Sequence, residues 1–272
     1  MKVFGAIEAG GTKFICATGS SPDDIETTRI PTTTPKETLA AVATWFQGQS
    51  KRRITAIGIG CFGPLELNPL SPVFGRITTT PKGAWRNCDI RGEVHKALGV
   101  TVHLDTDVNA ALLGESRWGA AQGLQGCLYL TVGTGIGGAF GNGHSEMGHI
   151  RIPHDGSFPG VCPYHGDCLE GLASGPAMEA RWGRRADDLP PDHPAWAIEA
   201  RYLALGIANL TLTLAPRRIL MGGGVMRHQP LFDPIRRELR LILADYVAVP
   251  EIFPPGLGER AGILGALALC TK

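Results

Sequence analysis

Two short glycine-rich turns, each directly after an apolar strand-like run, constrain the fold of this chain more than any other feature. Residues 9–13 read Ala-Gly-Gly-Thr-Lys between strand-like runs at 3–8 and 14–18, and residues 133–135 read Gly-Thr-Gly between runs at 128–132 and 136–140. A tight turn between two such runs is typical of a β-hairpin. Because each half of the chain carries one, we expect two halves that are built alike.

Strands and helices alternate in the rest of the chain. Residues 35–47 predict a helix, because Thr34 and Glu37 have the spacing of a capping box and the apolar residues recur with the helical period. The other expected elements are buried strands at 54–60 and 218–221, an irregular segment at 61–90, and helices at 108–118, 199–214 and 261–269. This alternation predicts an α/β protein.

Two GxGxxG patterns, at 58–63 and 133–138, are similar to dinucleotide-binding loops. Such a loop needs a helix that begins within the motif, so that the helix N-terminus faces the pyrophosphate. Pro64 disfavours a helix after the first pattern, and the additional glycines disfavour one after the second. The glycine turns can still present backbone N–H groups to phosphate oxygens, so they are either phosphate-binding loops or ordinary tight hairpins.

Two runs carry acidic groups that suit a reaction with phosphate. Residues 8–13 combine a carboxylate, Glu8, that can hold Mg²⁺ through water with a hydroxyl and a cation. Asp107 stands where an apolar strand gives way to a helix. The residues alone leave two interpretations of Asp107: it caps that helix, or it accepts the proton of an alcohol that attacks a phosphoryl group.

Cysteine and histidine gather in one short run. Cys162, His165 and Cys168 are each separated by two residues, and His149 lies upstream as a fourth donor. Four nitrogen and sulfur donors match a closed, tetrahedral structural zinc site, which leaves no open position for a catalytic water. The alternative is a loose cluster of buried cysteines.

Composition excludes several classes of protein. With 26 basic and 25 acidic residues, the chain does not favour nucleic-acid binding, and the basic triplet at 51–53 is expected to be a solvated helix end. No run approaches the ~20 apolar residues of a membrane span, and the N-terminus lacks the apolar core of a signal peptide. Seven cysteines without a disulfide framework predict reduced thiols and a cytoplasmic location.

The glycine-rich segments resemble those of the ROK sugar kinases, over residues 5 to about 268. Residues 5–14 resemble the first phosphate motif as the fructokinase branch has it, with Glu8 where an aspartate is more usual. Residues 132–137 resemble the second phosphate motif, and 220–226 the adenosine-side loop. The resemblance implies a two-domain actin/hexokinase/Hsp70-like (ribonuclease H-like) ATPase fold with an interdomain cleft.

The implied activity is the ATP-dependent phosphorylation of a hexose, with fructose to fructose 6-phosphate as the leading candidate. The resemblance makes Asp107 the general base and Asp105 structural, and it implies ATP, Mg²⁺ and a structural Zn²⁺ as cofactors. It also implies an N-terminal domain of residues 1–115 with the C-terminal helix 258–272, and a larger domain of residues 116–257 that carries the zinc-binding loop.

Individual site residues follow from the same resemblance. The implied ATP and magnesium contacts are Glu8, Gly10, Gly11, Thr12, Lys13, Gly133, Thr134, Gly135, Pro176, Gly222, Gly223, Gly224, Val225 and Met226. The implied sugar contacts are Gly63, Asp107, Glu146, His149 and Glu170. The implied zinc ligands are His149, Cys162, His165 and Cys168, and the zinc would fix the loop that holds the sugar.

The chain departs from the family between Gly143 and Glu146, where typical ROK kinases carry a longer insertion. The alternatives are therefore a sugar- and nucleotide-binding protein of low or no kinase activity, or a kinase for mannose, glucose or an N-acetylhexosamine. A ROK repressor is disfavoured, because only seven residues precede Glu8. Residues 81–85 roughly match a family loop near the sugar and receive no role. ROK kinases are commonly dimers, so a homodimer is an expected assembly.

Overall fold

The computed structural model describes residues 2–49, 53–141 and 143–271, so Lys51 and Arg52 of the basic triplet lie outside the described residues. The chain divides into two compact units. Unit 1 comprises Met1–Gln122 and Arg260–Lys272, and unit 2 comprises Gly123–Glu259. Unit 1 extends past residue 115 because helix α3 (Asp107–Trp118) packs along the C-terminal helix α8 (Ala261–Leu269).

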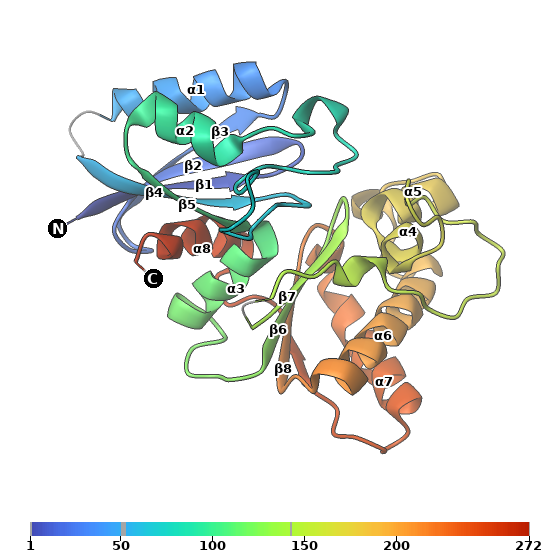
Figure 1. The fold of residues 1–272 in the computed structure, drawn as a ribbon. Helices are drawn as coiled ribbons and strands as arrows, with labels where there is room; N and C mark the ends of the chain where they lie inside the picture. Colours follow the sequence, from blue (N-terminus) through green and yellow to red (C-terminus); the bar gives the residue numbers. More distant parts are fainter. Residues whose placement is uncertain (1, 50–52, 142, 272) are drawn as a thin grey trace. The chain divides into compact units, whose positions relative to one another are not determined.

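Unit 1 is built on a five-stranded sheet of order β3-β2-β1-β4-β5 (Figure 1). Strand β1 pairs antiparallel with β2 and parallel with β4, and β4 pairs parallel with β5. The strands are β1 (Val3–Ala9), β2 (Lys13–Gly19), β3 (Ile25–Pro31), β4 (Ile54–Cys61) and β5 (Thr101–Thr106). The expected hairpin around the first glycine turn is therefore confirmed.

Helices cover both faces of this sheet. On one face, α1 (Pro35–Gly48) and α2 (Ile90–Leu98) pack Val42, Phe46 and Val94 against the strands. The predicted capping box of α1 is confirmed, because the Thr34 hydroxyl accepts from the Glu37 N–H and the Glu37 carboxylate accepts from the Thr34 N–H. Helices α3 and α8 contact β4 from the other side.

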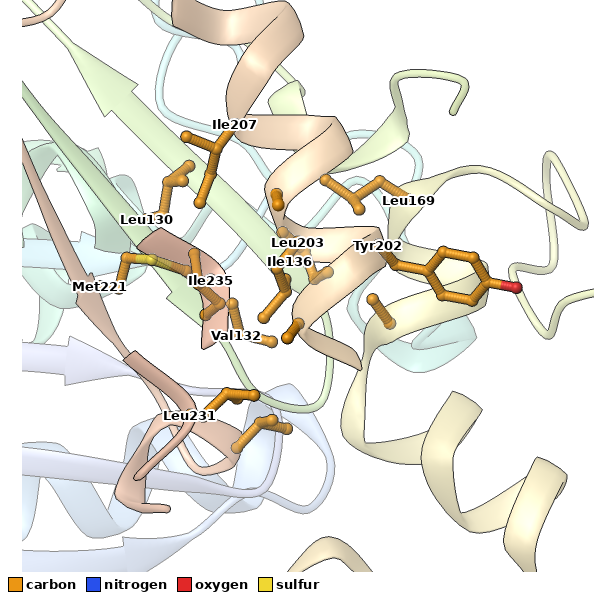
Figure 2. Close-up of a cluster of buried hydrophobic side chains, with 14 of the residues drawn as sticks. Leu130, Val132, Ile136, Leu169, Tyr202, Leu203, Ile207, Met221, Leu231 and Ile235 are labelled. Atoms are coloured by element: carbon orange, nitrogen blue, oxygen red, sulfur yellow. The ribbon is translucent and has the colours of Figure 1, made fainter. Parts of the chain in front are cut away.

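Unit 2 contains a four-stranded sheet of order β7-β6-β8-β9. Figure 2 shows its core, where Leu130 and Met221 from the strands meet Leu203 of α6 and Ile235 of α7. The elements are β6 (Cys127–Val132), β7 (Ile136–Phe140), α4 (Leu169–Ala173), α5 (Gly175–Trp182), α6 (Ala195–Leu214), β8 (Arg218–Gly222), α7 (Phe232–Leu243) and β9 (Glu251–Phe253). Helix α6 begins four residues before its expected start, because Ala195 and Trp196 are themselves buried in the core.

Short 3₁₀ turns connect several of these elements. They lie at Gly83–Trp85, Met147–His149, Ala186–Asp188, Val225–Arg227, Gln229–Leu231 and Gly258–Arg260. None of the helices in the described ranges combines the length and the apolar character that crossing a bilayer requires.

The two sheets share one connection pattern, which confirms the expected internal repeat. In each sheet a hairpin supplies the first two strands, and the first strand of the hairpin then pairs parallel with the next strand after a helical segment. A further parallel strand follows on the same side in both units, as β5 in one and β9 in the other. Each glycine turn consequently joins a central strand to its antiparallel neighbour.

Helices α3 and α8 cross in backbone contact. A Cβ atom on Gly265 would lie 1.7 Å from the Ala110 carbonyl oxygen, and one on Gly114 would lie 2.8 Å from the Gly265 nitrogen. Side chains at these two positions would therefore force the helices apart. Because α3 begins with Asp107, this crossing helps to fix the candidate base relative to the sheet.

Replacement of Gly265 by alanine is expected to lower the free energy of unfolding by about 1–3 kcal/mol or more, because the new methyl group overlaps the backbone of α3. The matched control is Gly48→Ala, where a Cβ atom meets nothing within 4 Å. Thermal and denaturant unfolding of the two variants measures the difference. Equal stability of the Gly265→Ala variant and the parent chain would contradict the close crossing.

Candidate active site

The candidate residues of unit 1 lie along one edge of its sheet. Strands β1, β4 and β5 run parallel, and their register pairs Ala9 with Cys61 and Cys61 with Thr106. The first glycine turn and Asp107 follow β1 and β5 directly, and Gly63 follows β4 after one residue. The carboxyl ends of parallel strands are the usual ligand-binding edge of an α/β sheet.

The first glycine turn is held by hydrogen bonds to its backbone. The Gly10 N–H donates to the Lys13 carbonyl at 3.0 Å. Thr32, which follows β3, donates from its backbone N–H to the Thr12 carbonyl at 3.0 Å and from its hydroxyl to the Gly10 carbonyl at 2.8 Å. These bonds fix the turn from the β3 side and leave the side chains of Thr12 and Lys13 exposed.

Glu8 lies near the end of β1 and reaches the first turn of α8. A Cβ atom on Gly262 would lie 2.6 Å from the Glu8 carboxyl carbon, so only glycine leaves room for this carboxylate. The N-terminal turn of a helix favours a negative charge, because its backbone N–H groups point outward and the helix dipole is positive there. The Glu8 carboxyl group therefore lies at a helix end that favours anions.

Asp107 is the first residue of α3, and it is not the helix cap. The Thr106 hydroxyl is the cap, since it accepts from the Asn109 N–H at 3.1 Å. One Asp105 oxygen accepts from the Thr106 N–H at 2.9 Å and from the Asn109 amide at 2.7 Å, which suits its expected structural role. The alternative interpretation of Asp107 as a cap is therefore wrong, and its carboxylate instead accepts from the adjacent Val108 N–H at 2.9 Å.

A buried thiol lies close to this carboxylate. Burial raises the pKa of Cys61 well above its usual value, and the negative charge of Asp107 raises it further. Cys61 is therefore a neutral neighbour of Asp107, and it offers no second base or nucleophile.

In unit 2 the two remaining glycine segments also share one edge. Strands β6 and β8 run parallel, and Thr131 pairs with Gly222, so the turn at 133–135 and the loop at 222–224 begin side by side. Gly223 has a φ of 95°, and a Cβ atom there would lie 2.4 Å from the Val132 carbonyl oxygen. Only glycine satisfies both the left-handed backbone and the close approach.

Helix α5 begins against the same turn. Its first residue, Gly175, donates from its N–H to the Gly133 carbonyl at 2.8 Å. The Ser174 hydroxyl caps the helix by accepting from the Ala177 N–H at 3.3 Å, and Pro176 occupies the first turn. Unit 2 thus places a helix N-terminus beside glycine turns, a combination that suits phosphate groups.

The four cysteine and histidine donors converge in unit 2. His149, Cys162, His165 and Cys168 offer ligand atoms that all lie within 4.8 Å of one another. The Nδ1 atom of His149 is 3.4 Å from the Cys168 sulfur and 3.6 Å from the Cys162 sulfur, and His165 Nδ1 is 3.7 Å from the Cys162 sulfur. Zn–S bonds of about 2.3 Å and Zn–N bonds of about 2.0–2.1 Å in a tetrahedron separate N and S by about 3.5 Å.

These distances fit a tetrahedral zinc site better than a loose cluster of cysteines. Burial raises the pKa of the Cys168 thiol to about 11 when no metal is bound, so metal binding would displace its proton. The ligand loop is braced by Asp167, which forms an ion pair with Arg151 and a hydrogen bond with His154 at 3.1 Å.

Glu170 connects the metal loop to the second glycine turn. Its Oε2 atom accepts from the Ile136 N–H at 2.9 Å, and a Cβ atom on Gly135 would lie 2.6 Å from that oxygen. Glu146 is exposed, precedes the 3₁₀ turn that contains His149, and lies 3.6 Å from His144. The predicted residues therefore form two groups, one in each unit.

One residue at the first turn received no role from the sequence. The side chain of Lys82 crosses Gly11, with its Cε atom 2.6 Å from the position that a Cβ atom would occupy. No spacing signal connects the two residues, since they are far apart in the chain. The local hints are the rough match of residues 81–85 to a family loop and the Trp85 that follows, whose buried ring anchors this segment.

The chain is similar to known proteins both in sequence and in structure. The sequence profile of the ROK family matches residues 4–272. A putative fructokinase of Bacillus subtilis (strain 168) is 45% identical over 99% of this chain and 96% of that protein, and a fructokinase of Pediococcus pentosaceus is 43% identical over 98% and 97%. The crystal structure of a ROK family glucokinase from Streptomyces griseus in complex with glucose and AMPPNP superimposes with a TM-score of 0.80, at 27% identity, over 98% of both chains.

Proposed function

The chain belongs to the ROK family, and from this premise we propose that it is an ATP-dependent kinase that phosphorylates fructose to fructose 6-phosphate. The observation that carries the proposal is the position of Asp107 at the start of α3, on the same sheet edge as the glycine turn at 10–12. A base and a phosphate loop on one edge are the parts that phosphoryl transfer requires. Fructose is proposed as the hexose because several of the similar proteins are fructokinases.

In the proposed reaction the oxygen of the fructose 6-hydroxyl attacks the γ-phosphorus of ATP. Asp107 accepts the hydroxyl proton as the new P–O bond forms. The bond between the γ-phosphorus and the bridging oxygen breaks, and its electron pair leaves with ADP. Little covalent chemistry falls to the protein, so its residues act mainly by positioning the reactants and by stabilising charge.

We assign the nucleotide to the glycine segments. In unit 1 the proposed phosphate contacts are the turn at 10–12 and Lys13. In unit 2 they are Thr134 and the N-terminus of α5. Glu8 would hold Mg²⁺ through water, since a carboxylate is a ligand that Mg²⁺ prefers. The loop at 222–226 would contact the adenosine. Because ATP is the donor, we expect the reaction to take place in the cytoplasm.

The metal centre is assigned to Zn²⁺, held by His149, Cys162, His165 and Cys168. A closed set of four protein ligands gives the ion a structural role, because no position is left for water or substrate. The ion would fix the loop between Glu146 and Glu170. We propose that Glu146, His149, Glu170 and Gly63 bind the sugar hydroxyls.

The alternative function is a sugar- and nucleotide-binding protein without turnover. Its support is the length of the chain: alignment with the Bacillus subtilis relative extends over 289 positions, whereas this chain has 272 residues. The relative therefore contains residues that this chain lacks. We expect the missing residues at Gly143–Glu146, before the proposed sugar-binding motif.

A coupled assay of ADP release with Mg·ATP tests the proposal against fructose, mannose, glucose and N-acetylated hexoses. We expect fructose to raise ADP release well above the sugar-free rate and above the other sugars. A preference for another hexose would support the kinase assignment but change the assigned substrate. If no sugar of the panel raises ADP release, in protein that holds zinc and binds fructose, the chain is instead a binding protein.

A further inference from the structure

Lys82 reaches the first glycine turn from a distant part of the chain. If Gly11 carried a Cβ atom, that atom would lie 2.6 Å from the Lys82 Cε atom, 3.6 Å from its Cδ atom and 3.6 Å from its Nζ atom. The missing side chain at Gly11 therefore makes room for the lysine. As a result, the Lys82 ammonium group lies beside the turn at 10–12.

The segment that carries Lys82 is anchored to the core of unit 1. Trp85 is 1% exposed, its indole N–H donates to the Thr33 carbonyl at 2.9 Å, and its ring contacts Phe14 and Phe62. The Trp85 N–H also donates to the Lys82 carbonyl at 2.8 Å. The backbone of Lys82 is consequently fixed, although its side chain is exposed.

The charge of Lys82 is not compensated in the described part of the chain. Within residues 2–49, 53–141 and 143–271, the ammonium groups of Lys82 and Lys13 form neither an ion pair nor a hydrogen bond. The Glu8 carboxylate, at the end of the strand before the turn, lies against Gly262 of α8. A turn flanked by two unpaired lysines attracts an anion.

We propose that Lys82 is a catalytic residue that contacts the phosphoryl group in transfer from ATP to the sugar. The inference rests on the proposed kinase function and adds a second cation to Lys13. While the bond to ADP breaks and the bond to the fructose oxygen forms, negative charge spreads over the three equatorial oxygens of the phosphoryl group. An ammonium group held over the phosphate loop stabilises that charge.

The Lys82→Met variant tests this role, because methionine keeps most of the length of the side chain and removes its charge. We expect kcat to fall by about 10²–10³-fold, with the KM for fructose nearly unchanged. The affinity for Mg·AMPPNP should fall about 10-fold while that for Mg·ADP is retained, because only the former carries the γ-phosphate. Lys82→Arg should recover part of both losses.

Lys96→Met is the matched control, since Lys96 is an exposed lysine of α2 in the same unit. It should leave kcat and both nucleotide affinities at the parent values. A Lys82→Met variant with a normal kcat would overturn the inference. So would a variant in which only the KM for fructose rises, because that result would make Lys82 a sugar contact.

A double-mutant cycle with Gly11 tests the geometry itself. The backbone of Gly11 lies outside the left-handed region, so alanine is tolerated there, and its methyl group would push the Lys82 side chain aside. We expect Gly11→Ala to lower kcat in the parent chain and to have little further effect in the Lys82→Ala variant. If the double variant instead shows the product of the two single fold-losses in kcat, the two positions act independently. That result would refute the proposed course of Lys82 across the turn.

These measurements separate the inference from the proposed function. A parent chain that releases no ADP with any sugar of the panel would refute the kinase assignment. The difference between Mg·AMPPNP and Mg·ADP binding would still decide whether Lys82 contacts the γ-phosphate. If the ratio of the affinities for Mg·AMPPNP and Mg·ADP is the same in the parent chain and in the Lys82→Met variant, the role of Lys82 is refuted, whether or not the parent chain turns over.

Discussion

Replacing Asp107 by asparagine is expected to lower kcat by about 10²–10⁴-fold while fructose still binds. Asparagine has nearly the same size, and its oxygen can still accept from the Val108 N–H, but its amide cannot take the proton of the attacking hydroxyl. The fold and the start of α3 should therefore survive. Initial rates of ADP release measure the loss, and calorimetric titration with fructose measures the binding.

Asp105→Asn provides the matched control for this experiment. The Asp105 oxygen accepts from the Thr106 N–H and the Asn109 amide, and an asparagine oxygen can accept in its place. We expect kcat to remain close to the parent value in this variant. Near-normal turnover in the Asp107→Asn variant would remove Asp107 from the mechanism, and loss of fructose binding would indicate damage to the site instead.

Replacing Cys162 by serine is expected to abolish zinc binding and with it the affinity for fructose. The parent chain should hold about one zinc per chain, and the variant close to none, because a closed tetrahedral site needs all four donors. The melting temperature should fall by about 5 °C or more, since metal binding contributes to folding. Metal analysis and thermal unfolding measure both effects independently of activity.

Cys88→Ser is the control for this prediction. Cys88 lies in unit 1 and is only partly buried, so its replacement should leave the zinc content unchanged. Treatment of the parent chain with a chelator should reproduce the effects of Cys162→Ser. A parent chain that is free of zinc after expression in zinc-supplemented medium, yet stable and able to bind fructose, would contradict the proposed metal centre.

Features encoded by neighbouring residues were predictable from the sequence. The hairpins could be predicted because glycine turns separate apolar runs, and α1 because Thr34 and Glu37 form a local capping box. The metal-ligand candidates could be grouped because three of them recur at one short spacing, and the structure brings all four together. Such signals depend on local chemistry, which tertiary packing did not override in these segments.

Features that depend on distant contacts were not predictable. The close crossing of α3 and α8 needs Gly114 and Gly265 to meet, and neither position carries a local sign of its partner. The sequence alone also left Asp107 open as a cap, because both Thr106 and Asp107 suit that role. In the structure the Thr106 side chain accepts the capping hydrogen bond of α3, so Thr106 is the cap. In the same way, only the fold brings Lys82 to Gly11.

The central claim is that this chain transfers the γ-phosphoryl group of ATP to the 6-hydroxyl of fructose. Nuclear magnetic resonance of ³¹P, with fructose labelled by ¹³C at C6, follows donor and acceptor in one sample. We predict that ADP and a phosphate monoester appear in equal amounts, with ³¹P coupling to the labelled carbon. Formation of ADP with inorganic phosphate, or no change in zinc-loaded protein, would contradict the claim.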